Sequence, residues 1–112
     1  MQKHNYISQV RHEYIHFQEY QIAIKNNTKD GVVNVSKAME EIDSSKYARE
    51  IMAASLNACD MERNCIIIEN NISIYATMND SEAVAEAYSN CDSDNKLCNS
   101  VKKFIRKKWG VK

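Results

Sequence analysis

The chain has 112 residues, of which 44% are hydrophobic and 27% charged, with fifteen acidic and fifteen basic side chains. This composition excludes a disordered chain, and the length allows a real core, so residues 1–112 are predicted to form a single domain. The chain has no proline and only two glycines, which disfavours strands joined by tight turns, and no apolar run is long enough to cross a bilayer. We therefore expect an all-α fold.

The first predicted element is a helix over about residues 4–25. Its apolar side chains recur every three or four residues, with Gln21 as the one polar gap: Ile7, Val10, Tyr14, Phe17 and Ile24. This spacing predicts that the stripe packs against the core. The polar stretch 26–31 that follows is predicted to be a loop, because it is rich in turn-forming residues and ends at Gly31.

Two further helices are predicted between residues 32 and 59. The stretch 65–78 is ambiguous, because it fits either a helix or a hairpin of two β-branched strands. We favour the helix, since no other part of the chain offers a sheet and an isolated hairpin is marginal in water. A helix over residues 82–90 is expected after Asn79, which stands three residues before Glu82 as in a capping box. The last helix should bury these side chains: Cys98, Val101, Ile105 and Trp109. Together these elements predict a small bundle of about five helices.

One short motif points to zinc chemistry. His12, Glu13 and His16 stand in the order H-E-x-x-H, in which two imidazoles can converge on one ion while the glutamate activates its water. At about 100° per residue, however, the two histidines fall nearly opposite the apolar stripe. We therefore expect a solvated pair of histidines, no metal and no catalytic residue. If a metal were bound, its third ligand is expected to be one of three carboxylates: Glu40, Glu41 or Glu50.

The four cysteines form two close pairs, Cys59 with Cys65 and Cys91 with Cys98. Neither pair has the two-residue gap of a zinc knuckle, and each flanks a polar, turn-like insert. Such pairs lie too far apart to bridge on one straight helix, but they can meet at a corner between two helices. The spacing therefore predicts two disulfides that staple the bundle, and a periplasmic or secreted location. Four reduced cysteines in a cytoplasmic protein are one alternative, and a metal site is another.

The neutral net charge conceals two regions of opposite sign. Residues 37–94 carry twelve acidic and four basic side chains, a balance of −8, whereas residues 95–112 carry seven basic side chains and no acidic one. Because local potential steers encounters, the acidic region is predicted to dock a basic partner protein through Glu40, Glu41, Asp43, Glu50, Asp60 and Glu62. The basic tail is compatible with a nucleic-acid contact, or with cations that complement the dipole of the last helix.

These patterns favour an interaction protein over an enzyme. The sequence contains no glycine-rich phosphate loop, so neither an enzyme nor a cofactor is expected. The leading hypothesis is a small protein of an oxidising compartment, an inhibitor or immunity-type protein that binds its partner through the acidic face. A zinc-dependent hydrolase using residues 12–16 is the first alternative. A cytoplasmic regulator whose basic tail contacts nucleic acid is the second.

Overall fold

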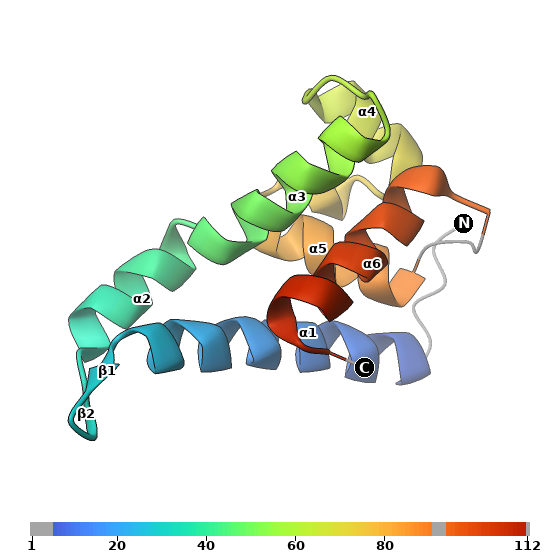
Figure 1. Ribbon diagram of the computed structural model, residues 1–112. Coiled ribbons are helices and arrows are strands. Elements are labelled where there is room, and N and C mark those ends of the chain that lie inside the picture. Colours follow the sequence, from blue (N-terminus) through green and yellow to red (C-terminus); the bar gives the residue numbers. More distant parts are fainter. Residues whose placement is uncertain (1–5, 91–93, 112) are drawn as a thin grey trace.

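The computed structural model describes residues 6–90 and 94–111, which form six α-helices, a 3-10 helix and a two-stranded hairpin (Figure 1). In chain order the elements are α1 (Tyr6–Asn26), β1 (Thr28–Lys29), β2 (Val32–Val33), α2 (Val35–Asp43), α3 (Lys46–Ala58), α4 (Cys65–Asn71), η1 (Tyr75–Thr77), α5 (Asp80–Asn90) and α6 (Lys96–Trp109). The predicted all-α class is confirmed, apart from the short hairpin. None of the described helices combines the length and apolar character that a membrane span requires.

The helices surround α5. This helix packs against α1, α3, α6 and η1, while α1 runs along one edge of the bundle (Figure 1). The main core cluster draws its largest fully buried apolar side chains from four helices: Ile15, Ile51, Met52, Val84, Leu97, Val101 and Ile105. Burial of one such side chain contributes about 1.5–3 kcal/mol, which makes this cluster the main source of stability. The buried stripe predicted for the last helix is confirmed, with Trp109 partly buried at its end.

The hairpin lies where the sequence predicted a loop. Thr28 pairs with Val33, and Lys29 with Val32, in antiparallel register. Asp30 and Gly31 join the strands with φ values of 55° and 79°. A two-residue turn with two positive φ angles suits the right-handed twist of a hairpin, and Asp-Gly is a favoured pair for it. The Asp30-Gly31 pair therefore indicates a hairpin, in place of the irregular loop predicted for residues 26–31.

The ambiguous stretch 65–78 forms the helix α4 and, after a break at residues 72–74, the 3-10 helix η1, so the hairpin alternative is wrong and the favoured single helix is divided in two. The helix α4 begins after Asn64, whose side-chain oxygen accepts a 2.9 Å hydrogen bond from the Ile67 backbone N–H. The predicted cap before α5 is confirmed in the same way, because the Glu82 backbone N–H donates to the Asn79 side chain at 2.8 Å. Each cap satisfies a backbone donor that has no partner within its own helix.

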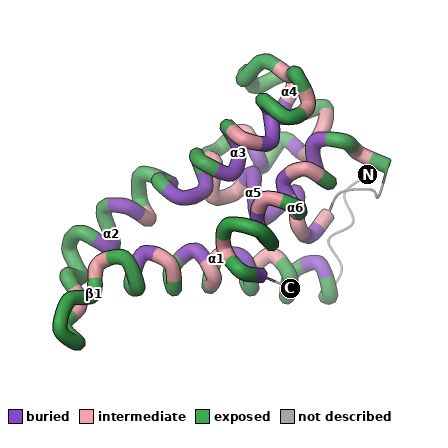
Figure 2. Tube along the Cα trace, in the orientation of Figure 1, coloured by how far each residue is buried: buried purple, intermediate pink, exposed green. Residues whose placement is uncertain are grey.

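The apolar stripe of α1 does not face the core, and this prediction is wrong. We call its residues (Ile7, Val10, Tyr14, Phe17 and Ile24) the outer stripe; their exposed fractions run from 39% at Ile24 to 59% at Ile7. The opposite side, here called the inner face, packs on the bundle and comprises Ser8, His12, Ile15, His16, Glu19 and Ala23. Figure 2 shows this division as exposed turns along the side of α1 that points away from the other helices. Periodicity locates a stripe on a helix, but it does not say which face the rest of the chain covers.

The predicted bridge between Cys59 and Cys65 is absent. Both cysteines carry free thiols. Cys59 Sγ lies 3.3 Å from Ser100 Oγ on α6, whereas Cys65 is exposed at the start of α4, so the two thiols have different surroundings. No disulfide joins any two residues within 6–90 and 94–111. The predicted pairing of Cys91 with Cys98 lies outside the described residues, because Cys91 is not among them.

Candidate metal centre

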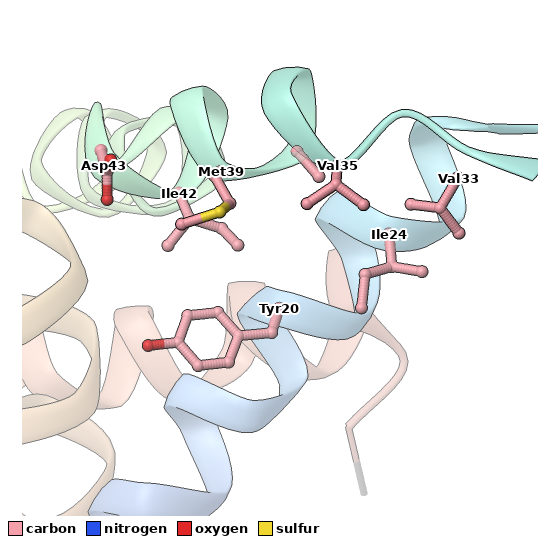
Figure 3. A pocket seen from close by; sticks show the side chains of 8 residues that line it. Tyr20, Ile24, Val33, Val35, Met39, Ile42 and Asp43 are labelled. Atoms are coloured by element: carbon pink, nitrogen blue, oxygen red, sulfur yellow. The ribbon is translucent and has the colours of Figure 1, made fainter.

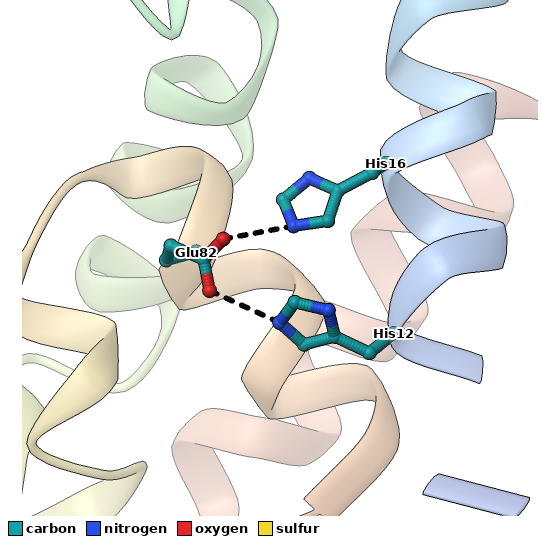
Figure 4. A group of neighbouring side chains, drawn as sticks. All are labelled: His12, His16 and Glu82. Atoms are coloured by element: carbon teal, nitrogen blue, oxygen red, sulfur yellow. Dashed lines mark hydrogen bonds and ion pairs between the residues drawn. The ribbon is translucent and has the colours of Figure 1, made fainter. Parts of the chain in front are cut away.

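His12 and His16 point into the bundle from the inner face of α1, towards Glu82 on α5 (Figure 4). His12 Nε2 lies 3.0 Å from Glu82 Oε2, and His16 Nε2 lies 2.9 Å from Glu82 Oε1. The two imidazoles are mostly covered, with 19% and 17% of their side chains exposed. One carboxylate thus joins both histidines across about 70 residues of sequence. The prediction of a solvated histidine pair is wrong.

The spacing of these three groups fits a metal ion. A ligand atom from each of His12, His16 and Glu82 lies within 4.8 Å of the other two. Zinc binds histidine nitrogen and carboxylate oxygen at about 2.0–2.2 Å, so ligand atoms in a tetrahedral site are about 3.4 Å apart. The observed nitrogen–oxygen distances are slightly shorter than that. A small outward movement of Glu82 would therefore admit the ion.

Two further carboxylates surround this group and are almost completely buried. Glu19 and Glu86 are each 1% exposed. Glu19 accepts a 2.7 Å hydrogen bond from the Ser81 hydroxyl, and its Oε1 lies 4.0 Å from His16 Nδ1. Carboxylates behind a metal-binding histidine commonly orient the ring and raise its basicity. Glu19 is placed to do this for His16.

Glu86 lies beside the other histidine, on the side of its Nε2 atom rather than its Nδ1 atom. It accepts hydrogen bonds from the Ser73 hydroxyl at 2.8 Å and from the Asn90 amide at 3.0 Å. Its Oε2 lies 3.5 Å from His12 Nε2. Both buried carboxyl groups therefore accept hydrogen bonds from uncharged donors, and the basic side chains that pair with them within residues 6–90 and 94–111 are the two histidines.

The centre has an excess of negative charge. Three carboxyl groups (Glu19, Glu82 and Glu86) lie beside the two imidazoles, and the exposed Glu13 adds a fourth at the rim, so acidic groups outnumber basic ones here. The ion pairs that lysine and arginine form within residues 6–90 and 94–111 join Lys46 to Glu41 and Arg63 to Asp80, so neither pair involves these carboxylates. Buried charge is costly unless it is paired or coordinates a metal. A divalent cation would supply the missing positive charge.

The electrostatics at His16 have the same origin. The adjacent Glu19 carboxylate, followed by Glu82, raises the pKa of His16 above its ordinary value of 6.5, against the opposing effect of burial. A higher pKa means that the carboxylates favour positive charge at the ring. In a metal complex the ion takes the place of that proton between His16 and Glu82.

One side of the centre is open. A hollow of about 550 Å³ is lined by the three candidate ligands together with Glu13, Phe17 and Tyr20. Glu13 is the glutamate of the sequence motif, and its Oε1 lies 3.6 Å from His12 Nδ1. Catalytic zinc sites keep one coordination position open beside three protein ligands. The hollow gives this centre room for a water molecule or a small ligand.

Compared with protein-family models, curated proteins and solved structures, the chain matches none. What the centre does must therefore follow from its own chemistry.

The third candidate ligand differs from those expected. Glu40, Glu41 and Glu50 were the carboxylates considered from the sequence, whereas the structure brings Glu82 to the histidines. In the sequence, Glu82 stands out only as part of a helix cap, three residues after Asn79. Its distance of 66 residues from His16 gives no local spacing signal, and only the packing of α5 on α1 reveals it.

The residues predicted to form an acidic face are only partly available. Glu40, Asp43, Glu50, Asp60 and Glu62 are exposed. They extend from α2 to the loop after α3, at opposite ends of that pair of helices in Figure 1. Glu41 is buried, and its role is structural.

Glu41 links the end of α1 to the start of α3. Its carboxylate accepts hydrogen bonds from the Tyr47 hydroxyl and from the Asn27 amide at 2.6 Å, and it pairs with Lys46 at 3.2 Å. These donors, the Tyr47 hydroxyl first, lower the pKa of Glu41 to about 2. Glu41 is therefore unavailable to a partner.

The basic tail lies on α6, with its cations around the buried stripe. Four of the five side chains are exposed: Lys103, Arg106, Lys107 and Lys108. The fifth, Lys102, is partly buried, and burial together with Arg106 and Arg11 lowers its pKa. The last turn of α6 thus carries cations at the end where the helix dipole is negative, which agrees with the structural interpretation of the tail.

A second hollow lies between α1 and α2 (Figure 3). It measures about 510 Å³ and is lined almost entirely by apolar side chains: Tyr20, Ile24, Val33, Val35, Ala38, Met39 and Ile42, with Asp43 at its edge. Tyr20 also lines the hollow beside the histidines. The groove therefore continues the apolar surface of α1 onto α2.

Proposed function

We propose that this protein binds a divalent transition-metal ion, zinc being the best suited, through His12, His16 and Glu82. The observation that carries the proposal is the approach of both Nε2 atoms to the two oxygens of one carboxylate, at 3.0 and 2.9 Å. Two imidazoles and a carboxylate are a ligand set typical of zinc. The buried carboxylates Glu19 and Glu86 add negative charge beside it.

Metal analysis of the purified chain tests this proposal. We expect one zinc ion per chain, lost in His16→Ala and in Glu82→Gln. His4→Ala is the matched control, because it removes the third histidine of the sequence and leaves His12, His16 and Glu82 in place. Cobalt(II) substituted for zinc should show no thiolate-to-metal absorption, which excludes binding by the cysteines. Substoichiometric metal, or equal loss in all three variants, would refute the proposal.

A metal-dependent hydrolase is the more specific candidate, and the position of Glu13 favours it. Glu13 lines the same hollow as the three ligands. A zinc ion with three protein ligands would supply an acidified water, and Glu13, at the rim of the hollow, would be the carboxylate that takes up its proton. We expect slow zinc-dependent cleavage of an activated ester that Glu13→Gln abolishes without changing zinc affinity. The same assay tests the sequence-based expectation that the protein is not an enzyme, since absence of turnover by the zinc-loaded chain would agree with it.

The interaction-protein hypothesis stays a prediction. Exposure of Glu40, Asp43 and Glu50 is what a docking face for a basic partner requires. A bound partner whose affinity survives neutralisation of these three carboxylates would argue against it. The expected periplasmic or secreted location rested on two bridges, and with free thiols at Cys59 and Cys65 only the Cys91–Cys98 pair still supports it.

A further inference from the structure

The outer stripe is an unusual surface for a helix that packs on its own domain. Five large apolar side chains lie exposed along one line of α1, flanked by exposed Tyr6 and Tyr20. From their exposed fractions, these seven side chains present roughly 650 Å² of surface, above the ~300–600 Å² of the largest apolar patch on a typical monomer. A patch of this size usually marks an interface.

The spacing of the stripe identifies the shape of what covers it. The positions 7, 10, 14, 17, 21 and 24 follow steps of three and four residues without interruption. These are the a and d positions of three heptads, with Gln21 as the single polar residue at an a position. Such a seam fits a partner helix that carries the same repeat. The α1 helix of a second copy has that repeat and the same length, about 31 Å for its 21 residues.

We propose that a second copy of this chain covers the outer stripe, with the α1 helices of the two copies paired side by side as a short two-stranded coiled coil. The available area agrees with this. Two outer stripes with their flanking tyrosines offer about 1,300 Å² in total, within the ~1,200–2,000 Å² that stable interfaces bury. Val35 and Met39, exposed on the neighbouring groove, can add to it.

The residues beside the seam are compatible with self-pairing. Arg11, Glu13 and Lys25 flank it and give no single sign of charge, so two copies do not repel each other there. In a parallel pairing each e position meets the g position of the preceding heptad on the other helix. Arg11 then approaches Tyr6 of the second copy, and Lys25 approaches its Tyr20. A cation over an aromatic ring contributes about 0.5–1 kcal/mol at an exposed site.

The pairing does not depend on the proposed metal. Of the candidate ligands, His12 and His16 lie on the inner face of α1 and Glu82 lies on α5, whereas the seam follows the outer stripe. Phe17 and Tyr20, at the edge of the seam, also line the hollow beside the histidines, but neither is a candidate ligand. The mass in solution, measured by light scattering with a chelator present, therefore tests the dimer alone. We expect a concentration-dependent dimer of about 26 kDa, twice the chain mass of 12.9 kDa. A monomer at the highest attainable concentration would overturn the proposal.

Variants distinguish the seam from other surfaces. Val10→Glu combined with Tyr14→Glu should give a monomer that keeps its helical circular dichroism, because both side chains are exposed in the single chain. Ile66→Glu is the matched control, since Ile66 is an exposed apolar residue on α4, and this variant should remain dimeric. Gln21→Leu should tighten the dimer several-fold, because a polar residue at an a position weakens a coiled coil. Dimers that persist in the double variant, or an unchanged dissociation constant for Gln21→Leu, would overturn the proposal.

Discussion

The inner face of α1 is more polar than its outer face, although the inner face is the buried one. Inward lie two histidines and a buried glutamate around Ile15, and outward lie the five apolar residues of the outer stripe. A helix packed only for stability would have the reverse arrangement. The inner face thus contributes Ile15 to the core but also carries the polar groups that the proposed ion would need, and the outer face carries the apolar surface that the proposed second helix would cover.

The largest expected effect is the difference in unfolding free energy between a substitution on the inner face of α1 and one on its outer stripe. Ile15→Ala should lower the free energy of unfolding by about 2–5 kcal/mol, because it leaves a cavity in the core. Phe17→Ala removes more atoms, yet it should change stability by less than about 1 kcal/mol, since Phe17 is half exposed. Urea titrations in the background of Val10→Glu combined with Tyr14→Glu keep the chain monomeric and measure both. Equal losses would mean that the faces are wrongly assigned.

The next effect is the stabilisation of the fold by zinc, which tests whether the inner face binds an ion. Zinc at a hundred times its dissociation constant should stabilise the fold by about 2.7 kcal/mol, because it binds the folded chain. Thermal melts with and without zinc measure this gain, and Glu82→Gln should abolish it. Cys65→Ser, which removes an exposed free thiol, is the control and should keep the gain. A loss of stability with zinc would indicate binding to the unfolded chain instead.

A smaller effect concerns the carboxylate behind His16. Glu19→Gln should lower zinc affinity by about 10–100-fold, the range found when a group that orients a metal ligand is removed. Competition with a coloured chelator measures the change. Glu69→Gln on the exposed surface of α4 serves as the control and should leave the affinity unchanged. Equal affinities in all three proteins would remove Glu19 from the centre.

The smallest effect tests the contact at the end of α1. Hydrogen bonds to Glu41 lower its pKa from 4.5 to about 2, so its ionised form stabilises the fold at neutral pH. This contribution is present above about pH 4.5 and is lost as the pH falls towards 2. The difference in unfolding free energy between the natural chain and Glu41→Gln should therefore be smaller at pH 3 than at pH 7. A constant difference between them would show that Glu41 has the same pKa in the folded and the unfolded chain.

Much of the fold could be predicted from the sequence, because helix periods and caps are local. The stripe of α6 and the Asn79 cap are examples. The orientation of α1 could not, since a stripe such as Val10 and Phe17 looks the same whether its own chain or a second chain covers it. Glu82 could not be assigned to the histidines either, because the contact needs α5 to pack on α1. The sequence positions of His12 and His16 alone do not indicate which carboxylate lies beside them in the fold.

Among the described residues, four helices begin at an asparagine whose side chain accepts a backbone hydrogen bond: Asn34, Asn64, Asn79 and Asn95. An amide does not titrate, so these helix starts keep their bonds in acid, where an aspartate cap would be neutralised. Glu41, which binds the side chains of Asn27, Lys46 and Tyr47, does lose its charge there. Acid should therefore loosen side-chain packing while the helices remain formed. The far-ultraviolet circular dichroism should persist to lower pH than the near-ultraviolet signal of Trp109.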